Sequence, residues 1–191
     1  MVINFRGYLM KYFSLISLSF VIFFSGSMFA QEAASLEDVV VSGDAAIRIS
    51  TRTEISASVA EQIAKTCIAR AEEEGVTVSI FILSPSGSIV YAHRMDGQMP
   101  IGVETALYKA ETALYTRAPT HETANRFSTD VARVTRVKLD WYLVSGGLPI
   151  IVDNQIIGSI GVGGAARGFD EICAHYALTE VLGPQPPLTQ D

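Results

Sequence analysis

The sequence LPIIVDNQIIGSIGV, residues 148–162, carries the clearest structural signal in the chain. Two apolar runs rich in β-branched residues flank Asp153-Asn154, a pair that tolerates the left-handed backbone of a tight turn. The pattern predicts a β-hairpin with strands over residues 148–152 and 155–162.

A second hairpin is predicted upstream. Residues 76–83 (VTVSIFIL) are apolar on both faces, which is typical of a central strand. The turn-forming residues 84–87 (SPSG) follow, so residues 88–94 are expected to pair back as the next strand.

Helical patterns surround the two hairpins. Apolar residues recur every four positions over 55–71, with Ser56 or Ser58 as the N-cap and Gly75 at the end. Residues 103–116 place alanines on one face, which favours close packing on a sheet.

Three further segments complete the helical pattern. A short helix over 120–127, capped by Thr120, follows Pro119. Residues 128–142 are ambiguous, with helix favoured. The last helix is expected to run from an N-cap at Asp170 to Gly183.

Because the strand–helix–strand alternation of parallel sheets is missing, we predict an α/β protein of the α+β type, an antiparallel sheet with helices packed on it.

The first thirty residues have the pattern of a secretory signal peptide. Arg6 and Lys11 precede an apolar run over 13–24, and small residues over 25–30 suggest cleavage before Gln31. That run reaches about 18 Å as a helix, short of the ~30 Å hydrocarbon layer, so a cleaved leader is favoured over an uncleaved membrane anchor. The start codon is open between Met1 and Met10. We expect a periplasmic or secreted protein with a leader (1–30), a flexible lead-in (31–53), a folded domain (54–185) and a C-terminal tail (186–191).

Charge and cysteine usage limit the partners. The formal charge is −6, and losing the leader with its two basic residues would make it −8, which disfavours nucleic acid. Cys67 and Cys173 have no CxxC partner, so they do not form a metal pair. Two buried thiols are favoured, while a disulfide in an exported protein stays open.

The glycine-rich residues 161–164 (GVGG) lie where a strand is expected to lead into a helix. They lack the full GxGxxG pattern of dinucleotide sites. Close backbone packing, or the approach of a small ligand, is the favoured interpretation.

Candidate ligand-binding side chains are few. No two of His93, His121 and His175 are spaced to share a metal on one helix turn. His121 lies at a predicted helix start, where an exposed imidazole could bind a metal or haem, whereas His175 is expected to be structural or partly exposed. His93 alternates with Arg94 along a predicted strand.

The turn after Arg94 has two interpretations. Arg94 and Asp96 form either an internal ion pair or a carboxylate-binding site in which Lys109 supports the arginine.

Several motifs, taken in order, resemble the GlcG/HbpS family of haem-binding and haem-degrading proteins, which includes the C-terminal domain of PduO. The matching pieces are VSI at 78–80, RMDG at 94–97, Lys109-Ala110, Thr112-Ala113, APT at 118–120, GGLPI at 146–150, IGSIGVGG at 157–164 and Asp170-Glu171. The resemblance implies a profilin-like fold, an antiparallel sheet flanked by helices, assembly into a homo-oligomer and haem binding, with Thr120 near the haem.

Haem binding sets physical requirements on the chain. Haem needs an apolar slot, a Lewis-basic donor and cations for its propionates. The sequence offers donors at His121, His93 and Met95, and cations at Arg94, Arg117 and Lys109. We expect these side chains to meet at one crevice.

Three functions follow from these observations. The leading hypothesis is an exported haem-binding protein acting in haem uptake, storage, sensing or degradation. The second is an enzyme on a small hydroxy acid, in which Arg94 and Lys109 hold the carboxylate and Asp96 acts as acid or base. The third is a non-catalytic oligomeric binding module. In each case membrane contact is expected only through an uncleaved leader.

Overall fold

The computed structural model describes residues 34–40, 53–129, 141–166 and 168–188. The chain divides into two units, Met1–Ala30 and Gln31–Asp191, and every described residue belongs to the second. The predicted leader and most of residues 128–142 lie outside the described residues.

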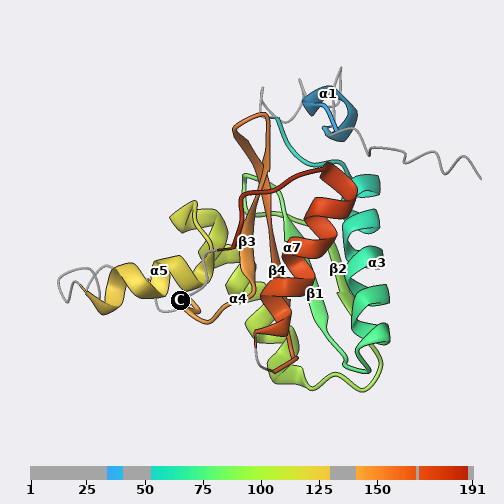
Figure 1. Ribbon diagram of the computed structural model, residues 1–191, viewed down its shortest axis with the longest axis vertical. Helices are drawn as coiled ribbons and strands as arrows, with labels where there is room; N and C mark the ends of the chain where they lie inside the picture. The colour runs from blue at the N-terminus through green and yellow to red at the C-terminus, as the bar shows by residue number, and fades with distance from the viewer. Residues whose placement is uncertain (1–33, 41–52, 130–140, 167, 189–191) are drawn as a thin grey trace, which may run out of the picture. The chain divides into compact units, whose positions relative to one another are not determined.

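A four-stranded antiparallel sheet forms the centre of the fold (Figure 1). Its strands are β1 (Ser79–Leu83), β2 (Ile89–Arg94), β3 (Gly147–Val152) and β4 (Gln155–Gly163), in the order β2-β1-β4-β3. Both predicted hairpins are confirmed, and β1 is central as expected. Asp153 and Asn154 take the left-handed backbone that the turn requires, with φ of 47° and 61°.

Helices cover both faces of the sheet. On one face α3 (Ala57–Glu73) and α7 (Phe169–Leu182) lie side by side and enclose the main hydrophobic core with the inward side chains of β1 and β4 (Figure 1). Those inward side chains are Ile80, Ile82, Ile160 and Val162. The structure is therefore α+β, with an antiparallel sheet between helices.

The other face of the sheet carries α4 (Pro100–Thr116), followed by the shorter α5 (Thr120–Ser128). The residues of β4 that face α4 are small, namely Ser159, Gly161 and Gly163. A Cβ atom on Gly161 would overlap the carbonyl oxygen of Ala106. Close packing, one of the two favoured interpretations of the glycine-rich stretch, is thus observed.

The two cysteines form a disulfide, and the preference for buried thiols is wrong. The Cα atoms of Cys67 on α3 and Cys173 on α7 lie 5.2 Å apart, and both residues are fully buried. They are 106 residues apart in the sequence, so only the packing of α3 on α7 could reveal the pairing.

The observed helix ends agree in part with the ends predicted from the sequence. Ser56 caps α3 by accepting a hydrogen bond from the backbone N–H of Val59 at 3.3 Å, and Gly183 ends α7, as predicted. α4 begins at Pro100, three residues earlier than expected, because proline suits the first turn of a helix.

Two predicted N-caps are wrong. Pro119, not Thr120, precedes α5, and Gly168, not Asp170, precedes α7. Thr120 and Asp170 instead make long-range contacts, described below.

The described residues of the predicted lead-in contact the folded domain. Residues Leu36–Val39 form the short helix α1, and Val40 bridges Ile55. The N–H of Ala34 also donates to the carbonyl oxygen of Leu182. Within the described residues, none of the helices is long and apolar enough to cross a bilayer.

Candidate functional site

The start of α7 is linked to both helices of the opposite layer by ionisable side chains. Asp170 of α7 contacts Lys109 of α4, and the next residue, Glu171, contacts His121 of α5. This region therefore brings together two of the predicted site residues, Lys109 and His121.

Lys109 is a buried cation with a defined set of partners. Its side chain is 3% exposed, and Nζ donates to Oδ2 of Asp170 at 2.6 Å and to the carbonyl oxygen of Val162 at 3.0 Å. The ammonium also lies 6.0 Å from the centre of the Tyr142 ring. The second carboxylate oxygen of Asp170 accepts from the N–H of Ala165. Burial raises the pKa of Asp170, and Lys109 opposes part of that rise.

Glycine at position 146 lets the chain pass close to this ion pair. Gly146 has a φ of +123°, and a Cβ atom there would lie 3.0 Å from Nζ of Lys109 and 2.8 Å from Cβ of Asp170. A larger residue would crowd the pair and strain the backbone.

A cleft of about 230 Å³, here called the α4 cleft, opens beside Lys109. Its walls come from the start of α4, residues 142–144 and the connection from β4 to α7. The lining side chains include Met99, Ile101, Thr105, Tyr142, Val144 and Asp170. Met99, Ile101 and Val144 are 65%, 56% and 51% exposed, although they are large and apolar. The α4 cleft therefore combines an apolar mouth with a buried ion pair.

His121 lies next to this region without lining the α4 cleft. Its Nδ1 atom lies 2.6 Å from Oε1 of Glu171, and both side chains are about nine-tenths buried. Thr120 is fully buried, and its hydroxyl accepts the N–H of Gly147 at 3.1 Å. Thr120 therefore ties α5 to β3.

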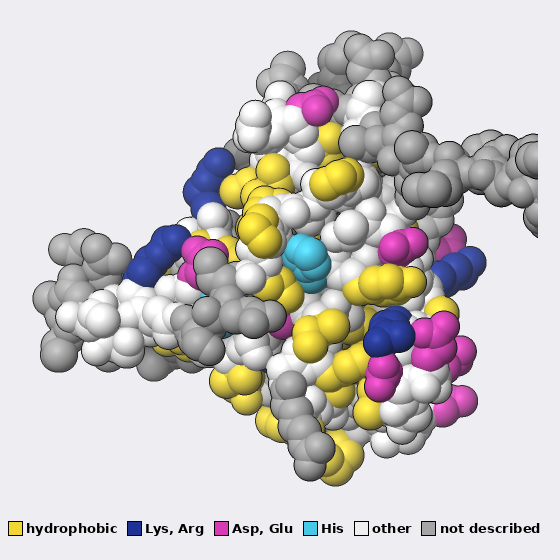
Figure 2. Space-filling view, viewed as in Figure 1, with side chains coloured by type: hydrophobic (Ala, Val, Ile, Leu, Met, Phe, Trp, Pro, Cys, Tyr) yellow, Lys and Arg dark blue, Asp and Glu magenta, His cyan; other side chains and the backbone are white. Residues whose placement is uncertain are grey.

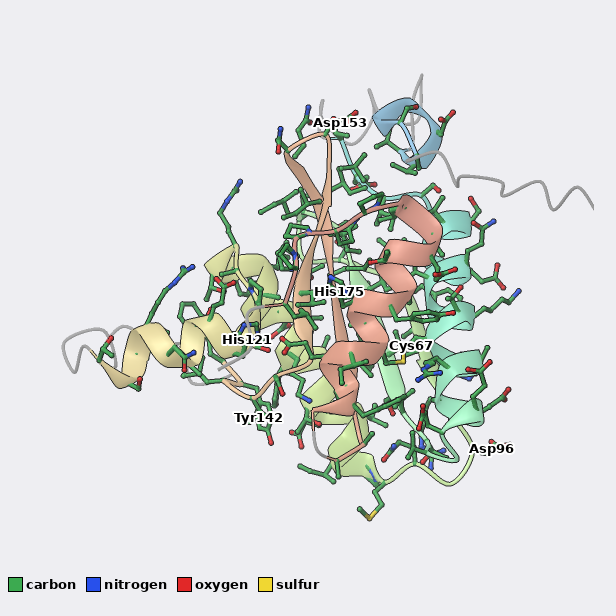
Figure 3. All side chains as sticks on the ribbon, viewed as in Figure 1. Cys67, Asp96, His121, Tyr142, Asp153 and His175 are labelled. Carbon is green, nitrogen blue, oxygen red and sulfur yellow. A yellow bond between two sulfur atoms is a disulfide. The ribbon has the colours of Figure 1, made fainter. Side chains whose placement is uncertain are left out.

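His93, Arg94 and Met95 occupy a different place. Together with Asp96 they line an open hollow of about 290 Å³ beside α3, here called the β2 hollow. The Arg94 guanidinium donates to the carbonyl oxygen of Gln98, and Sδ of Met95 accepts from the N–H of Val78. In Figure 3, Asp96 lies at one side of the molecule, and His121 and Tyr142 lie at the other.

Arg117 stands apart from both hollows. It is exposed at the C-terminal end of α4, with a left-handed φ of 56°. The expectation of one shared crevice is thus wrong. Only Lys109, among the six predicted site residues, lines the α4 cleft, because packing sends the others to different faces. The same separation means that Arg94 and Asp96 do not join Lys109 around one small acid.

The face bearing α7 and α3 shows a histidine among hydrophobic side chains (Figure 2). His175, labelled in Figure 3, lies on α7 with Nε2 2.9 Å from the carbonyl oxygen of Pro186, so it holds the C-terminal segment in place. Basic and acidic side chains gather over α3 in the same view. They include the ion pairs Lys65–Glu61 and Arg70–Glu73. The histidine is structural, as expected.

Metal binding gains no support from these contacts. Within the described residues, no group of three or more His, Cys, Asp or Glu side chains is arranged to hold a metal ion. If His121 binds iron, it does so outside any described group of three metal ligands, and its Nδ1 atom already contacts Glu171.

Sequence reasoning missed most residues of the α4 cleft. Asp170 was interpreted as a helix cap, because aspartate near a helix start commonly has that role. Met99 and Tyr142 carried no signal, since a single methionine or tyrosine in a loop matches no motif. The exposed apolar residues on both sides of the cleft become visible only once the chain is folded.

Comparison with known proteins places this geometry in a family. A family model described as "Haem degrading protein HbpS-like" matches residues 55–179. The chain belongs to the HbpS-like family. The match runs from the residue before the cap of α3 almost to the end of α7, so it includes the sheet and the α4 cleft.

Individual relatives agree with the family assignment. Protein GlcG of Escherichia coli K12 is 36% identical over 109 residues, which are 53% of this chain and 78% of GlcG. A crystal structure of HbpS is 30% identical, with a TM-score of 0.64 over 76% of this chain and all of that one. The crystal structure of a PduOC–heme complex shares the fold, at 22% identity and a TM-score of 0.60, over 66% and 94% of the two chains.

The α4 cleft offers the groups that haem requires. Haem needs apolar surface for the macrocycle, a Lewis-basic donor and a cation for a propionate. Met99, Ile101 and Val144 supply apolar surface, the thioether of Met99 is an exposed donor, and Lys109 is the cation. By donor chemistry the residues present fit haem.

Proposed function

We propose that this protein binds haem at the mouth of the α4 cleft. The observation that carries the proposal is the exposure of Met99, Ile101 and Val144 around a buried Lys109. Solvent-exposed apolar side chains next to a buried ion pair suit a ligand that has an apolar body and an anionic edge. The family description and the haem in the PduOC complex support the same ligand.

Each side chain has a distinct role in this proposal. Met99, Ile101 and Val144 contact the macrocycle, and the Tyr142 ring borders its edge. Lys109 would hold a propionate oxygen, and the thioether of Met99 would be the donor to iron. Bound haem would supply redox-active iron, while these residues bind and orient it and exclude water.

The size of the cleft bears on assembly. At about 230 Å³ it lies below the usual range of 300–1,000 Å³ for ligand pockets, so it takes an edge of the macrocycle rather than the whole. We therefore propose that the rest of the porphyrin is covered by another copy of this chain in a homo-oligomer. Sedimentation with and without haem tests this, and a monomer in both states would contradict it.

Haem titration followed at the Soret band tests the proposed function. The wild-type protein should give a saturable shift, and Met99→Ala with Val144→Ser should weaken binding at least tenfold by loss of apolar contact. Ile172→Ser is the matched control, because Ile172 is 52% exposed on α7 and does not line the cleft. A shift that never saturates, or equal loss in the control, would reject the proposal.

We also propose that the protein is exported, and that haem uptake, storage, sensing or degradation takes place outside the cytoplasm. The leader pattern in residues 1–30 supports export, and so does a structural disulfide, which persists in oxidising compartments. Mass spectrometry of the protein from a periplasmic or culture fraction should give a chain beginning at Gln31. An intact Met1 or Met10 terminus in the cytoplasmic fraction would contradict export.

A further inference from the structure

Among the described residues, the contacts of Lys109 leave one of its hydrogen-bond donors unused. An ammonium group has three N–H bonds. Two are directed at Asp170 and at the carbonyl oxygen of Val162, and among the described residues no third acceptor is present. Because Lys109 also lines the α4 cleft beside the Tyr142 ring, the third N–H can meet an oxygen atom of a ligand there.

Two neighbouring polar side chains in the cleft are occupied by protein contacts. Gln98 donates to the carbonyl oxygen of Thr77 at 2.6 Å and accepts from the N–H of Met99 at 2.9 Å. The hydroxyl of Thr105 donates to the carbonyl oxygen of Ile101. Among the described residues that line the cleft, Lys109 is accordingly the cationic donor, and a carboxylate is the ligand group that suits it best.

Charge balance limits how an anion can bind here. Lys109 and Asp170 neutralise one another at 2.6 Å in a buried setting, so a carboxylate that joins them would leave one uncompensated negative charge. A second carboxylate near Asp170 favours its protonated form, as in paired acids. Burial already raises the pKa of Asp170 in the free protein, which makes protonation easier.

We propose that the α4 cleft binds an organic carboxylate on Lys109 together with one proton, which is taken up by Asp170. The carboxylate is either a haem propionate or a separate small acid, and only the haem case rests on the proposed function. With bound ligand, Lys109 pairs with the ligand carboxylate, and the protonated Asp170 keeps the site neutral. Above the pKa of Asp170 in the free protein, affinity should fall up to about tenfold per pH unit.

Within the part of the chain that the structure describes, few other titratable groups surround the cleft. Tyr142 lines it, and Glu171 follows Asp170 on α7 with His121 of α5 as its partner. Arg94 at the end of β2 and Asp96 in the connection to α4 line the β2 hollow. Glu104 on α4 accepts from the hydroxyl of Tyr108. In the connection that follows β4, the described residues that line the cleft are Gly164 and Ala165, which do not titrate.

Calorimetry in buffers of different protonation enthalpy measures the proton directly. Haem, haem dimethyl ester and benzoate are titrated into the full-length protein between pH 6 and 8. Haem and benzoate should each take up close to one proton, whereas the ester, which lacks carboxylates, should take up none. In Asp170→Asn, uptake should vanish and haem should bind at least as tightly as to wild type. The Glu171→Gln variant changes the residue next to Asp170 and is the control for the loss of the Glu171–His121 pair. It should still take up close to one proton.

The outcomes separate this inference from the proposed function. Haem binding without proton uptake, unchanged in Asp170→Asn, overturns the inference and leaves haem binding standing. Benzoate binding with uptake, without haem binding, supports the inference and rejects the proposed function. If Asp170→Asn does not fold, the wild-type proton count still decides, because zero uptake at every pH overturns the proposal.

Discussion

Ser79 on β1 and Ser159 on β4 are fully buried, and their hydroxyl groups have no hydrogen-bond partner among the described residues. Both side chains belong to the face of the sheet that α4 covers. An unpaired buried hydroxyl destabilises a fold by about 1–3 kcal/mol. At these positions small size matters more than the hydroxyl.

Ser159→Ala should therefore raise the free energy of unfolding by about 1 kcal/mol. Thr112→Val is the matched contrast, because the Thr112 hydroxyl donates to Tyr108 and accepts the N–H of Tyr142. That variant should lose about 1–3 kcal/mol. Urea unfolding measures both, and a loss of stability in Ser159→Ala would show that its hydroxyl has a partner.

Asp170 gives stability a defined pH dependence at the level of one residue. Burial raises its folded-state pKa above the ordinary value of 3.8, so the folded protein binds the proton more tightly than the unfolded chain. The contribution of Asp170 to stability is then greatest below pH 3.8 and falls as the pH rises through the folded-state value. The difference in unfolding free energy between wild type and Asp170→Asn should fall with pH over that window. A flat difference in urea titrations from pH 3 to 7 would contradict this.

At the scale of elements, the decisive contact is that of α4 on β4. Gly161 and Gly163 allow the helix backbone to lie against the strand, with Cβ positions that would meet backbone atoms of Ala106 and Gly102. The same approach brings Lys109 within reach of Val162 and Asp170. The glycines therefore act on the site through helix position rather than by contact with an anion.

Gly161→Ala should lower the free energy of unfolding by about 1–3 kcal/mol, because the added methyl group overpacks the interface. It should also weaken haem binding, since a displaced α4 moves Lys109. Ala92→Val on the exposed position of β2 is the control, and it should change neither quantity appreciably. Unchanged stability in Gly161→Ala would refute the packing role.

For the molecule as a whole, the disulfide joins segments that are far apart in the chain. The bond between Cys67 and Cys173 closes a separation of 106 residues, so it restricts the unfolded chain strongly. It lies between α3 and α7, on the opposite face of the sheet from α4.

Replacing both Cys67 and Cys173 with alanine should lower the free energy of unfolding by about 2–5 kcal/mol. Haem affinity at the α4 cleft should stay within twofold, because the cleft lies across the sheet from the bond. Urea unfolding and Soret titration of the same preparation measure the two effects. Loss of haem binding in a variant that remains folded would show that the two layers are coupled.

The sequence alone determined the two hairpins, the existence of the helices and the α+β class. These depend on periodicity and turn chemistry within a few residues, as the Asp153-Asn154 turn and the Ser56 cap show. It also suggested Lys109 as a cation of the site, though not its partner.

Tertiary structure alone decided the site and the redox state of the cysteines. Lys109 and Asp170 are 61 residues apart, and Cys67 and Cys173 are 106 apart. Such contacts depend on which helix packs on which face of the sheet, and local sequence rules carry no information about that choice. The same packing separates Arg94 from Lys109, and it leaves Met99, Ile101 and Val144 exposed around one cleft.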